Sequence, residues 1–348
     1  MDSPLLGRRV GRLPAVAVVL GTNDIASAIG WRMARAGWGV LLLRDLDVAV
    51  LRRGMAFDDA MEDGAASLDG VVAVRAADPA AAAAVVASAG GVAVGRFGVG
   101  ALIAARVLAL DALVDARMHK YAEREDWRPL AACAVGVGPG FVAGSNVHVA
   151  VESLPGAEGA VVAAGPTASP TGKAIPLAGA GAERFVYAPL SGPWVAEAAL
   201  GAWVEAGQRI GRISGVALEA PLAGTIRGLV RSSPHGIVRG TKLLEIDPRR
   251  GALCRGIAPR PGRIAAGVAE ALGAGVTPTA QNAESWNREE YPSFNGIRLP
   301  ARVNLCGGWY YGGVGGGGLR GLRRASPEPC RLLGSIEDGP MPAGARFP

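Results

Sequence analysis

A four-residue turn near the start of the chain could bind an anion. It reads Gly21-Thr22-Asn23-Asp24 and lies between an apolar run and a helical pattern. In the dinucleotide-binding fingerprint, glycines in such a turn let the backbone approach a pyrophosphate at a helix N-terminus, whose free N–H groups favour anions. Only the first glycine is present here. Asn23 replaces the second, which is tolerated because asparagine enters left-handed conformations, and Ala26 replaces the third.

Two readings of this turn follow. In the first, the turn binds a nucleotide-like small molecule through Gly21, Thr22 and Asn23. In the second, the turn is purely structural. Asp24 is placed to cap the following helix, and its charge would then repel an incoming phosphate.

Two aspartates follow apolar runs and are further binding candidates. Asp45 follows the second run and occupies the position that binds a ribose hydroxyl in dinucleotide folds, although Arg44 precedes it. Asp115 ends a later run, and ligands of open α/β sheets bind outside the carboxyl ends of the strands. We predict ligand contacts at both, with helix capping as the alternative for Asp115.

A glycine-rich stretch, "GVGPGFVAG" at 136–144, is the next candidate. Its backbone amides at Gly138 and Gly140 could form an anion-binding nest, or the glycines only make tight turns. His148 and Glu152 alternate on one face of an expected strand. A lone pair of this kind is more often structural than catalytic. We nevertheless include His148 among the candidate binding residues.

The pattern around these residues predicts an α/β fold. The apolar run 15–20, the helical spacing of 24–36 and the second run 39–44 form a βαβ unit. Further alternation predicts a Rossmann-like doubly wound parallel sheet over residues 1–125. The remaining expected strands are 71–74, 92–94 and 113–116, and the remaining helices are 80–87 and 101–108.

The rest of the chain divides by composition. Residues 126–183 are a glycine-rich middle segment with short strands, 249–276 contain a helix near 264–272, and 277–348 have no apolar period and are predicted to be disordered.

Residues 184–248 contain the same hairpin twice. Each copy opens on Ala-Pro-Leu-x-Gly and continues with Val-x-x-Gly and an apolar strand. This duplication is typical of a lipoyl/biotinyl-like β barrel-sandwich module. Such carrier modules present a lysine between the two halves, but no lysine lies between Lys173 and Lys242. We therefore expect no covalent biotin or lipoate.

Composition excludes several classes of function. The net charge is +6, but only three of the 36 basic residues are lysines and the arginines are scattered, so we expect no nucleic-acid partner. The four cysteines have no metal-ligand spacing, so we expect no metal. No signal peptide or apolar span is visible, so we expect a cytoplasmic protein with no membrane partner.

Several motifs, in order, resemble one family. They are "GTNDIASAIGWRMARAGW", "RRGMAFDDAMEDG", "LVDARMHK", "GVGPGFVAGSNVHVAVES", "VEAGQRIGRISGVALEAPLAGTIRGL" and "IDPRRGALC". The chain resembles the YqeB-like proteins, accessory factors of the selenium-dependent molybdenum hydroxylase system, related in role to the XdhC/CoxI maturation factors. The resemblance implies a Rossmann-type domain followed by a lipoyl-like barrel, and it supplies no catalytic residues.

The resemblance implies a function in the maturation of xanthine dehydrogenase-type molybdenum hydroxylases. The expected cofactor is a molybdopterin dinucleotide or a related nucleotide, and the expected partners are the hydroxylase subunits. One alternative is an NAD(P)-dependent oxidoreductase, although no catalytic Tyr-x-x-x-Lys is evident. The other is a non-enzymatic scaffold that docks the hydroxylase. Whether the chain catalyses a reaction stays open.

Overall fold

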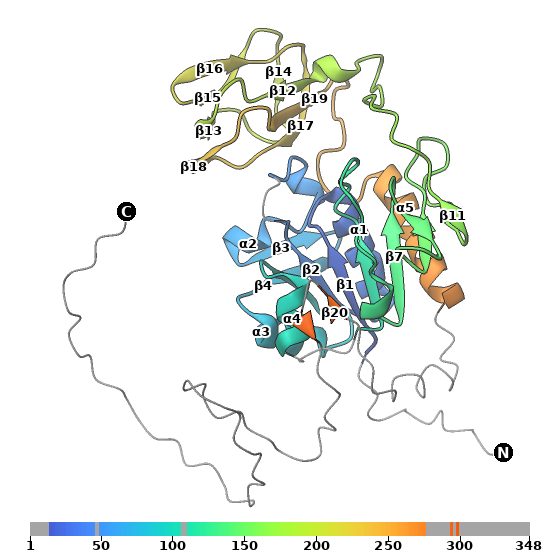
Figure 1. Cartoon of the computed structure of the whole chain (residues 1–348). Coiled ribbons are helices and arrows are strands. Elements are labelled where there is room, and N and C mark those ends of the chain that lie inside the picture. The colour runs from blue at the N-terminus through green and yellow to red at the C-terminus, as the bar shows by residue number, and fades with distance from the viewer. Residues whose placement is uncertain (1–13, 46–48, 106–109, 276–292, 295–296, 299–348) are drawn as a thin grey trace, which may run out of the picture. The chain divides into compact units, whose positions relative to one another are not determined.

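A computed structural model describes residues 14–45, 49–105, 110–275, 293–294 and 297–298 (Figure 1). The chain divides into two compact units, residues 1–286 and 287–348. In the second unit the described residues form β20 (Ser293–Phe294) and β21 (Ile297–Arg298), which pair antiparallel. Apart from these two strands, the tail 277–348 that we predicted to be disordered lies outside the described residues.

The first unit contains a nine-stranded sheet. All strands of this sheet run parallel to one another except the two at its edges. The edge strands β3 and β10 are antiparallel to their neighbours. In spatial order the strands are β10 (Val161–Val162), β9 (Val149–Val151), β7 (Cys133–Val137), β6 (Ala112–Asp115), β1 (Val16–Leu20), β2 (Gly39–Leu43), β5 (Val92–Gly95), β4 (Val71–Ala76) and β3 (Ala65–Leu68).

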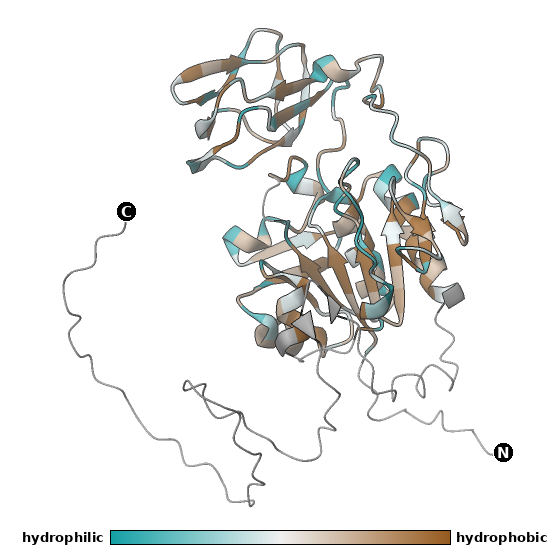
Figure 2. Ribbon diagram, viewed as in Figure 1, coloured by the Kyte–Doolittle hydropathy of each residue, from teal (hydrophilic) through white to brown (hydrophobic). Residues whose placement is uncertain are grey.

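The central strands are apolar because both faces of the sheet are covered. Strand β1 reads VAVVL and β2 reads GVLLL, and nearly all of their residues are buried. Parallel strands with covered faces have continuous apolar runs rather than alternation. Figure 2 shows these strands in brown, the hydrophobic end of its scale. This confirms the α/β fold predicted from the runs.

Helices α1 (Asp24–Arg35) and α5 (Pro259–Gly275) pack against each other. Their buried residues join one apolar core with β1, β2 and β7. Helix α3 (Pro79–Val86) packs on β2, β4 and β5, and α4 (Val99–Ala105) packs on α3. Shorter elements are α2 (Ala60–Asp63) and the 3-10 turns η1 (Arg53–Met55), η2 (Arg128–Leu130) and η3 (Ala182–Arg184).

The sheet continues beyond residue 125, where we expected the first domain to end. Strands β7, β9 and β10 all belong to it, and helix α5, from the far side of the 185–247 segment, packs on them. Two short strands, β8 (Val142–Ala143) and β11 (Gly165–Pro166), form a separate pair beside it. The glycines between residues 136 and 165 make the sequence resemble a linker, but most of them lie in turns between the strands of the nine-stranded sheet and of the β8–β11 pair.

The strand order reverses between β1 and β6. From β1 the chain proceeds through β2 and β5 on one side, and it then returns to β6, β7 and β9 on the other. In open α/β sheets the carboxyl ends of the strands at such a switch point are the usual place for a ligand.

Residues 185–247 form two four-stranded antiparallel sheets around a second apolar core, which includes the fully buried Trp194. Each hairpin copy supplies one adjacent pair of central strands: β13 with β15, and β17 with β19. The strands are β12 (Phe185–Tyr187), β19 (Lys242–Asp247), β17 (Gly224–Leu229) and β14 (Trp203–Val204) in one sheet, and β16 (Val216–Glu219), β15 (Arg209–Ile213), β13 (Gly192–Ala196) and β18 (Ser233–Ile237) in the other.

Candidate functional site

The turn between β1 and α1 lies at the switch point. Gly21 has φ +108°, and a Cβ there would lie 3.3 Å from the Ala116 carbonyl oxygen, so the chain after β6 approaches the turn closely. The Asn23 side chain accepts hydrogen bonds from the amides of Ile25 (2.9 Å) and Ala26 (3.0 Å) and donates one to the Ala116 carbonyl (2.8 Å). Asn23 therefore caps α1.

Our prediction that Asp24 caps this helix is wrong. Asn23 comes one residue earlier, in an extended conformation, which is the geometry of an N-cap. Asp24 is the first helical residue, and its carboxylate is left to bind Arg52.

Thr22 turns its side chain into the protein interior. Its hydroxyl donates to Oδ1 of the buried Asp58 (2.6 Å), which also contacts Arg44 (3.1 Å). Burial raises the pKa of Asp58, and Arg44 and the Thr22 hydroxyl oppose that rise. The amides of Thr22 and Asn23 have no hydrogen-bond partner among the described residues. What the turn can offer a ligand is therefore its main chain.

Asp45 contacts the Nε2 atom of His119, a residue in the loop after β6. Both side chains are partly exposed, and they lie beyond the carboxyl ends of β2 and β6. The pair thus flanks the Gly21 turn. An imidazole against a carboxylate can accept or donate a hydrogen bond to a ligand hydroxyl, and it can also transfer a proton.

Asp115 is fully buried, and protein groups bind its carboxylate. Oδ2 lies 2.7 Å from Nη2 of Arg117 and 3.2 Å from Nε1 of Trp127, and Nη1 of Arg124 lies 3.9 Å away. The Arg117 guanidinium also stacks on the Trp127 ring. We predicted a ligand contact at Asp115, but its carboxylate instead anchors the loop 117–127, which begins beside the Gly21 turn.

Gly138 and Gly140 follow β7 at the same edge and have φ values of +82° and +90°. A Cβ at Gly138 would lie 2.7 Å from Oγ of Ser153, and one at Gly140 would lie 3.0 Å from Nε of Arg124. These glycines therefore allow neighbouring chain segments to approach. The carbonyl between them, that of Pro139, accepts a hydrogen bond from Arg124 (2.9 Å).

His148 lies at the opposite edge of the sheet from the other candidates. Its Nδ1 accepts a hydrogen bond from the Ala134 amide (2.9 Å), near the amino end of β7. Because β9 runs parallel to β7, the residue before β9 lies at the amino ends of the strands. Burial, followed by nearby Arg128, lowers the pKa of His148. It is therefore not part of the candidate site.

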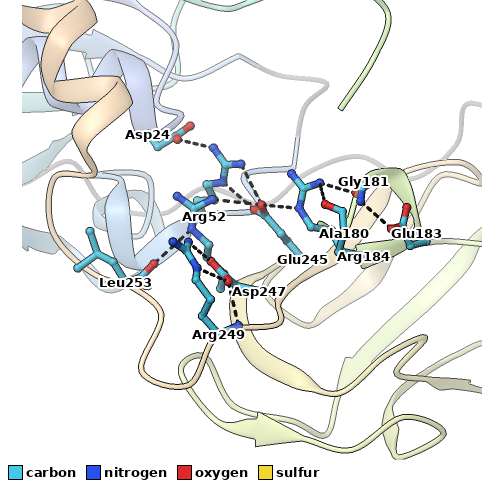
Figure 3. Close-up of polar contacts among 11 residues, drawn as sticks. Asp24, Arg52, Ala180, Gly181, Glu183, Arg184, Glu245, Asp247, Arg249 and Leu253 are labelled. Carbon is cyan, nitrogen blue, oxygen red and sulfur yellow. Dashed lines mark hydrogen bonds and ion pairs between the residues drawn. The ribbon is translucent and has the colours of Figure 1, made fainter. Parts of the chain in front are cut away.

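The structure adds a group of charged residues that the sequence did not predict (Figure 3). Arg52 donates to Oδ2 of Asp24 (2.8 Å) and to both oxygens of Glu245 (2.7 and 3.1 Å). Glu245 is fully buried on β19 and also contacts Arg227 (3.2 Å) and Arg184 (3.5 Å). Burial alone would raise the pKa of Glu245, but the arginines, Arg52 first, outweigh it and lower the pKa. The one signal in the sequence was a glutamate inside the apolar run "KLLEID".

The sequence of the chain was compared with families of known proteins and with individual proteins. No family model matches the sequence. The chain is 31% identical over 266 residues to the "Uncharacterized protein YqeB" of Escherichia coli (strain K12). The chain is similar to YqeB. The match covers 74% of this chain and 47% of the relative, so the chain spans about half the length of the curated relative it matches. The resemblance to YqeB-like proteins, predicted from the motifs, is confirmed over that part.

A solved structure also matches, at a level that carries no argument. It is the crystal structure of an aspartoacylase family protein from Mesorhizobium loti, which is 11% identical, with 69% of this chain and 87% of that chain covered and a TM-score of 0.25.

The described ranges of the chain also bear on membranes and metals. None of the helices in these ranges is both long and apolar enough to cross a bilayer. Within the same ranges, His, Cys, Asp and Glu side chains form no group of three or more that could hold a metal ion.

Proposed function

We propose that the chain binds a phosphate-bearing, nucleotide-like ligand at the carboxyl edge of its parallel sheet. The observation that carries this proposal is the turn 21–23, whose amides at Thr22 and Asn23 are free of partners in the described chain and lie at the switch point between β1 and β6. Free amides at a helix N-terminus favour an anion. The partly exposed Asp45–His119 pair beside the turn is then available to a ribose or pterin hydroxyl.

The biological role that fits this ligand is that of an accessory factor in molybdenum hydroxylase maturation. The ordered motifs and the similarity to YqeB support this assignment. A molybdopterin dinucleotide has the pyrophosphate that the Rossmann-like turn would bind. We assign residues 185–247 to a lipoyl-like module without a prosthetic group, a rigid surface suited to docking a hydroxylase subunit, because each hairpin copy forms one strand pair around a common core.

A second candidate is an NAD(P)-dependent oxidoreductase. Asp45 at the end of β2 favours it, because a carboxylate at that position binds the ribose hydroxyls of NAD. Arg44 beside it is already paired with Asp58 and Glu62 and therefore does not block a ribose at Asp45.

Calorimetry with cytosine and guanine molybdopterin dinucleotides, NAD and FAD tests the ligand. We expect one of the first two to bind, and Asn23→Asp to weaken that binding at least tenfold. Aspartate keeps the cap of α1 but puts a negative charge beside the free amides, and it also loses the hydrogen bond that Asn23 donates to the Ala116 carbonyl. Gln208→Glu adds the same charge in the 185–247 module and should leave binding unchanged.

The outcomes separate the candidates. Binding of NAD alone would replace the first function with the second. If none of the four ligands gives a heat of binding and the protein has an intact melting transition, the ligand proposal is contradicted. The role is tested in cells: a strain without this gene should lose molybdenum hydroxylase activity, and the Asn23→Asp chain should not restore it.

A further inference from the structure

A small depression opens at the carboxyl ends of β6, β7 and β9. Its volume is about 70 Å³. Pockets for drug-sized ligands have volumes of about 300–1,000 Å³, so this depression accommodates only a small group. Main-chain and side-chain atoms that follow three parallel strands line it, among them those of Met118, Pro139 and Ser153.

The charges that line this depression are mostly positive. Lys120, Lys173 and Arg260 contribute three cations, and Glu152 contributes one carboxylate. The Glu152 carboxylate is already occupied, because its oxygens accept hydrogen bonds from the amides of Ser153 (2.6 Å), Leu154 (2.7 Å) and Ala168 (2.8 Å). The lysine ammonium groups have no ion-pair partner among the described residues. The depression therefore has an excess of positive charge.

Arg260 is held in place at this depression. Its Nη2 donates to the Ser153 carbonyl (2.7 Å), and its Nε is buried with no hydrogen-bond partner in the described chain. The nearest carboxylate, that of Glu158, lies 3.9 Å from this Nε. The guanidinium thus has donor capacity that the protein does not use.

Ser153 adds a hydroxyl donor that the described residues do not use. The residue is 6% exposed, and its hydroxyl makes no hydrogen bond with any described residue. The hydroxyl oxygen is not among the side-chain atoms that are closed off from solvent without a partner, so it is open to a molecule in the depression. It can therefore donate a hydrogen bond to an anion bound there.

We propose that this depression is a binding site for a phosphoryl group, held by Lys120, Lys173 and Arg260 and by the hydroxyl of Ser153. Lysine binds phosphate as a point charge, and a hydroxyl adds a donor to one of its oxygens. The site uses none of the residues of the turn 21–23, so it goes beyond the proposed nucleotide function and does not depend on it. The phosphoryl group comes from free phosphate or from a small phosphate ester.

Calorimetry at constant ionic strength tests the site with inorganic phosphate, ribose 5-phosphate and acetate. We expect one of the two phosphates to bind and acetate to bind at least tenfold more weakly. Lys173→Gln should weaken phosphate binding at least fivefold, and Ser153→Ala at least threefold. Arg239→Gln removes one charge from an exposed position in the 185–247 module and should change nothing.

A second measurement uses the unaltered protein, and therefore does not depend on whether the variants fold. The chain has only three lysines. Phosphate should slow the acylation of Lys120 and Lys173, followed by peptide mass mapping, and should leave Lys242 unaffected. Three outcomes would overturn the proposal. Phosphate could protect all three lysines equally, or acetate could bind as tightly as phosphate. Phosphate binding could also survive Lys173→Gln and be lost in Asn23→Asp.

Discussion

Arg52 and Glu245, 193 residues apart in the sequence, form a two-point ion pair at 2.7 and 3.1 Å. The same guanidinium binds Asp24 in the first turn of α1 (2.8 Å). Arg52 therefore ties the helix that follows the nucleotide-type turn to β19 of the 185–247 module. Figure 3 shows the guanidinium between the two carboxylates.

Removing the charge of Glu245 should destabilise the protein. Glu245 is fully buried, and Glu245→Gln leaves Arg52, Arg184 and Arg227 without their common carboxylate. Breaking a buried ion pair from one side costs about 3–5 kcal/mol, and we expect a loss of about 3 kcal/mol in unfolding free energy because Arg52 keeps Asp24. Urea denaturation measures the loss. Arg212→Gln, which breaks an exposed pair with Glu197, should cost less than about 1 kcal/mol.

The contribution of Glu245 should depend on pH in a defined direction. Its pKa in the folded protein lies below the ordinary 4.5, because the arginines outweigh burial. The contribution is therefore fully present above pH 4.5 and is lost as the pH falls through the folded pKa. The difference in unfolding free energy between the wild type and Glu245→Gln should be constant near neutral pH and shrink in acid. A difference that grows in acid would contradict this assignment.

The contribution of Asp58 to stability should depend on pH in the opposite direction. Burial raises its pKa above the ordinary 3.8, against Arg44 and Thr22. A carboxyl group with a raised pKa stabilises the fold below its ordinary pKa and loses that contribution as the pH rises through the folded value. Relative to Asp58→Asn, the wild type should therefore lose stability as the pH rises from acid towards neutral. Chemical denaturation of both proteins over that range measures it, and a flat difference would mean that the pKa of Asp58 is not raised.

The cap of α1 should be worth a measurable free energy. Asn23→Ala removes two hydrogen bonds to helix amides and one to the Ala116 carbonyl, so we expect a loss of about 1–2 kcal/mol. Asn23→Ser should recover most of it, since serine is also a good N-cap. The two melting transitions decide this prediction, and equal stability of the alanine and serine variants would show that the cap contributes nothing.

The sequence predicts those parts of the fold that depend on local patterns. The continuous apolar runs at β1 and β2 and the helical spacing of α1 needed only a few neighbouring residues, and their bounds agree with the structure to within one residue. Strands β9 and β10 are three and two residues long and have no period of their own. They belong to the sheet because of pairing with β7 and packing under α5, which are contacts between distant parts of the chain.

The candidate site shows the same limit. Strand ends predicted correctly that Gly21, Asp45, Asp115 and Gly138 meet at one edge of the sheet. Periodicity states which face of a strand a residue occupies but not at which end of the strand it lies, so it gave no indication that His148 lies at the opposite edge from the other candidates. The pair Arg52–Glu245 and the partners of Asp115 depend on tertiary contacts, and the glutamate inside the apolar run "KLLEID" does not indicate which arginines bind it.

Asp115 should matter for stability rather than for direct contact with a ligand. Its carboxylate is fully buried, and it binds Arg117 and Trp127 with Arg124 close by. Asp115→Asn keeps the shape but removes the charge that these arginines face, so we expect a loss of about 3 kcal/mol in unfolding free energy. Asp126→Asn, at an exposed pair with Arg128, is the matched control and should cost less than about 1 kcal/mol. If Asp115→Asn instead melts with the wild type and only ligand affinity falls, the loop 117–127 is anchored by other contacts, and the carboxylate must turn towards the ligand when it binds.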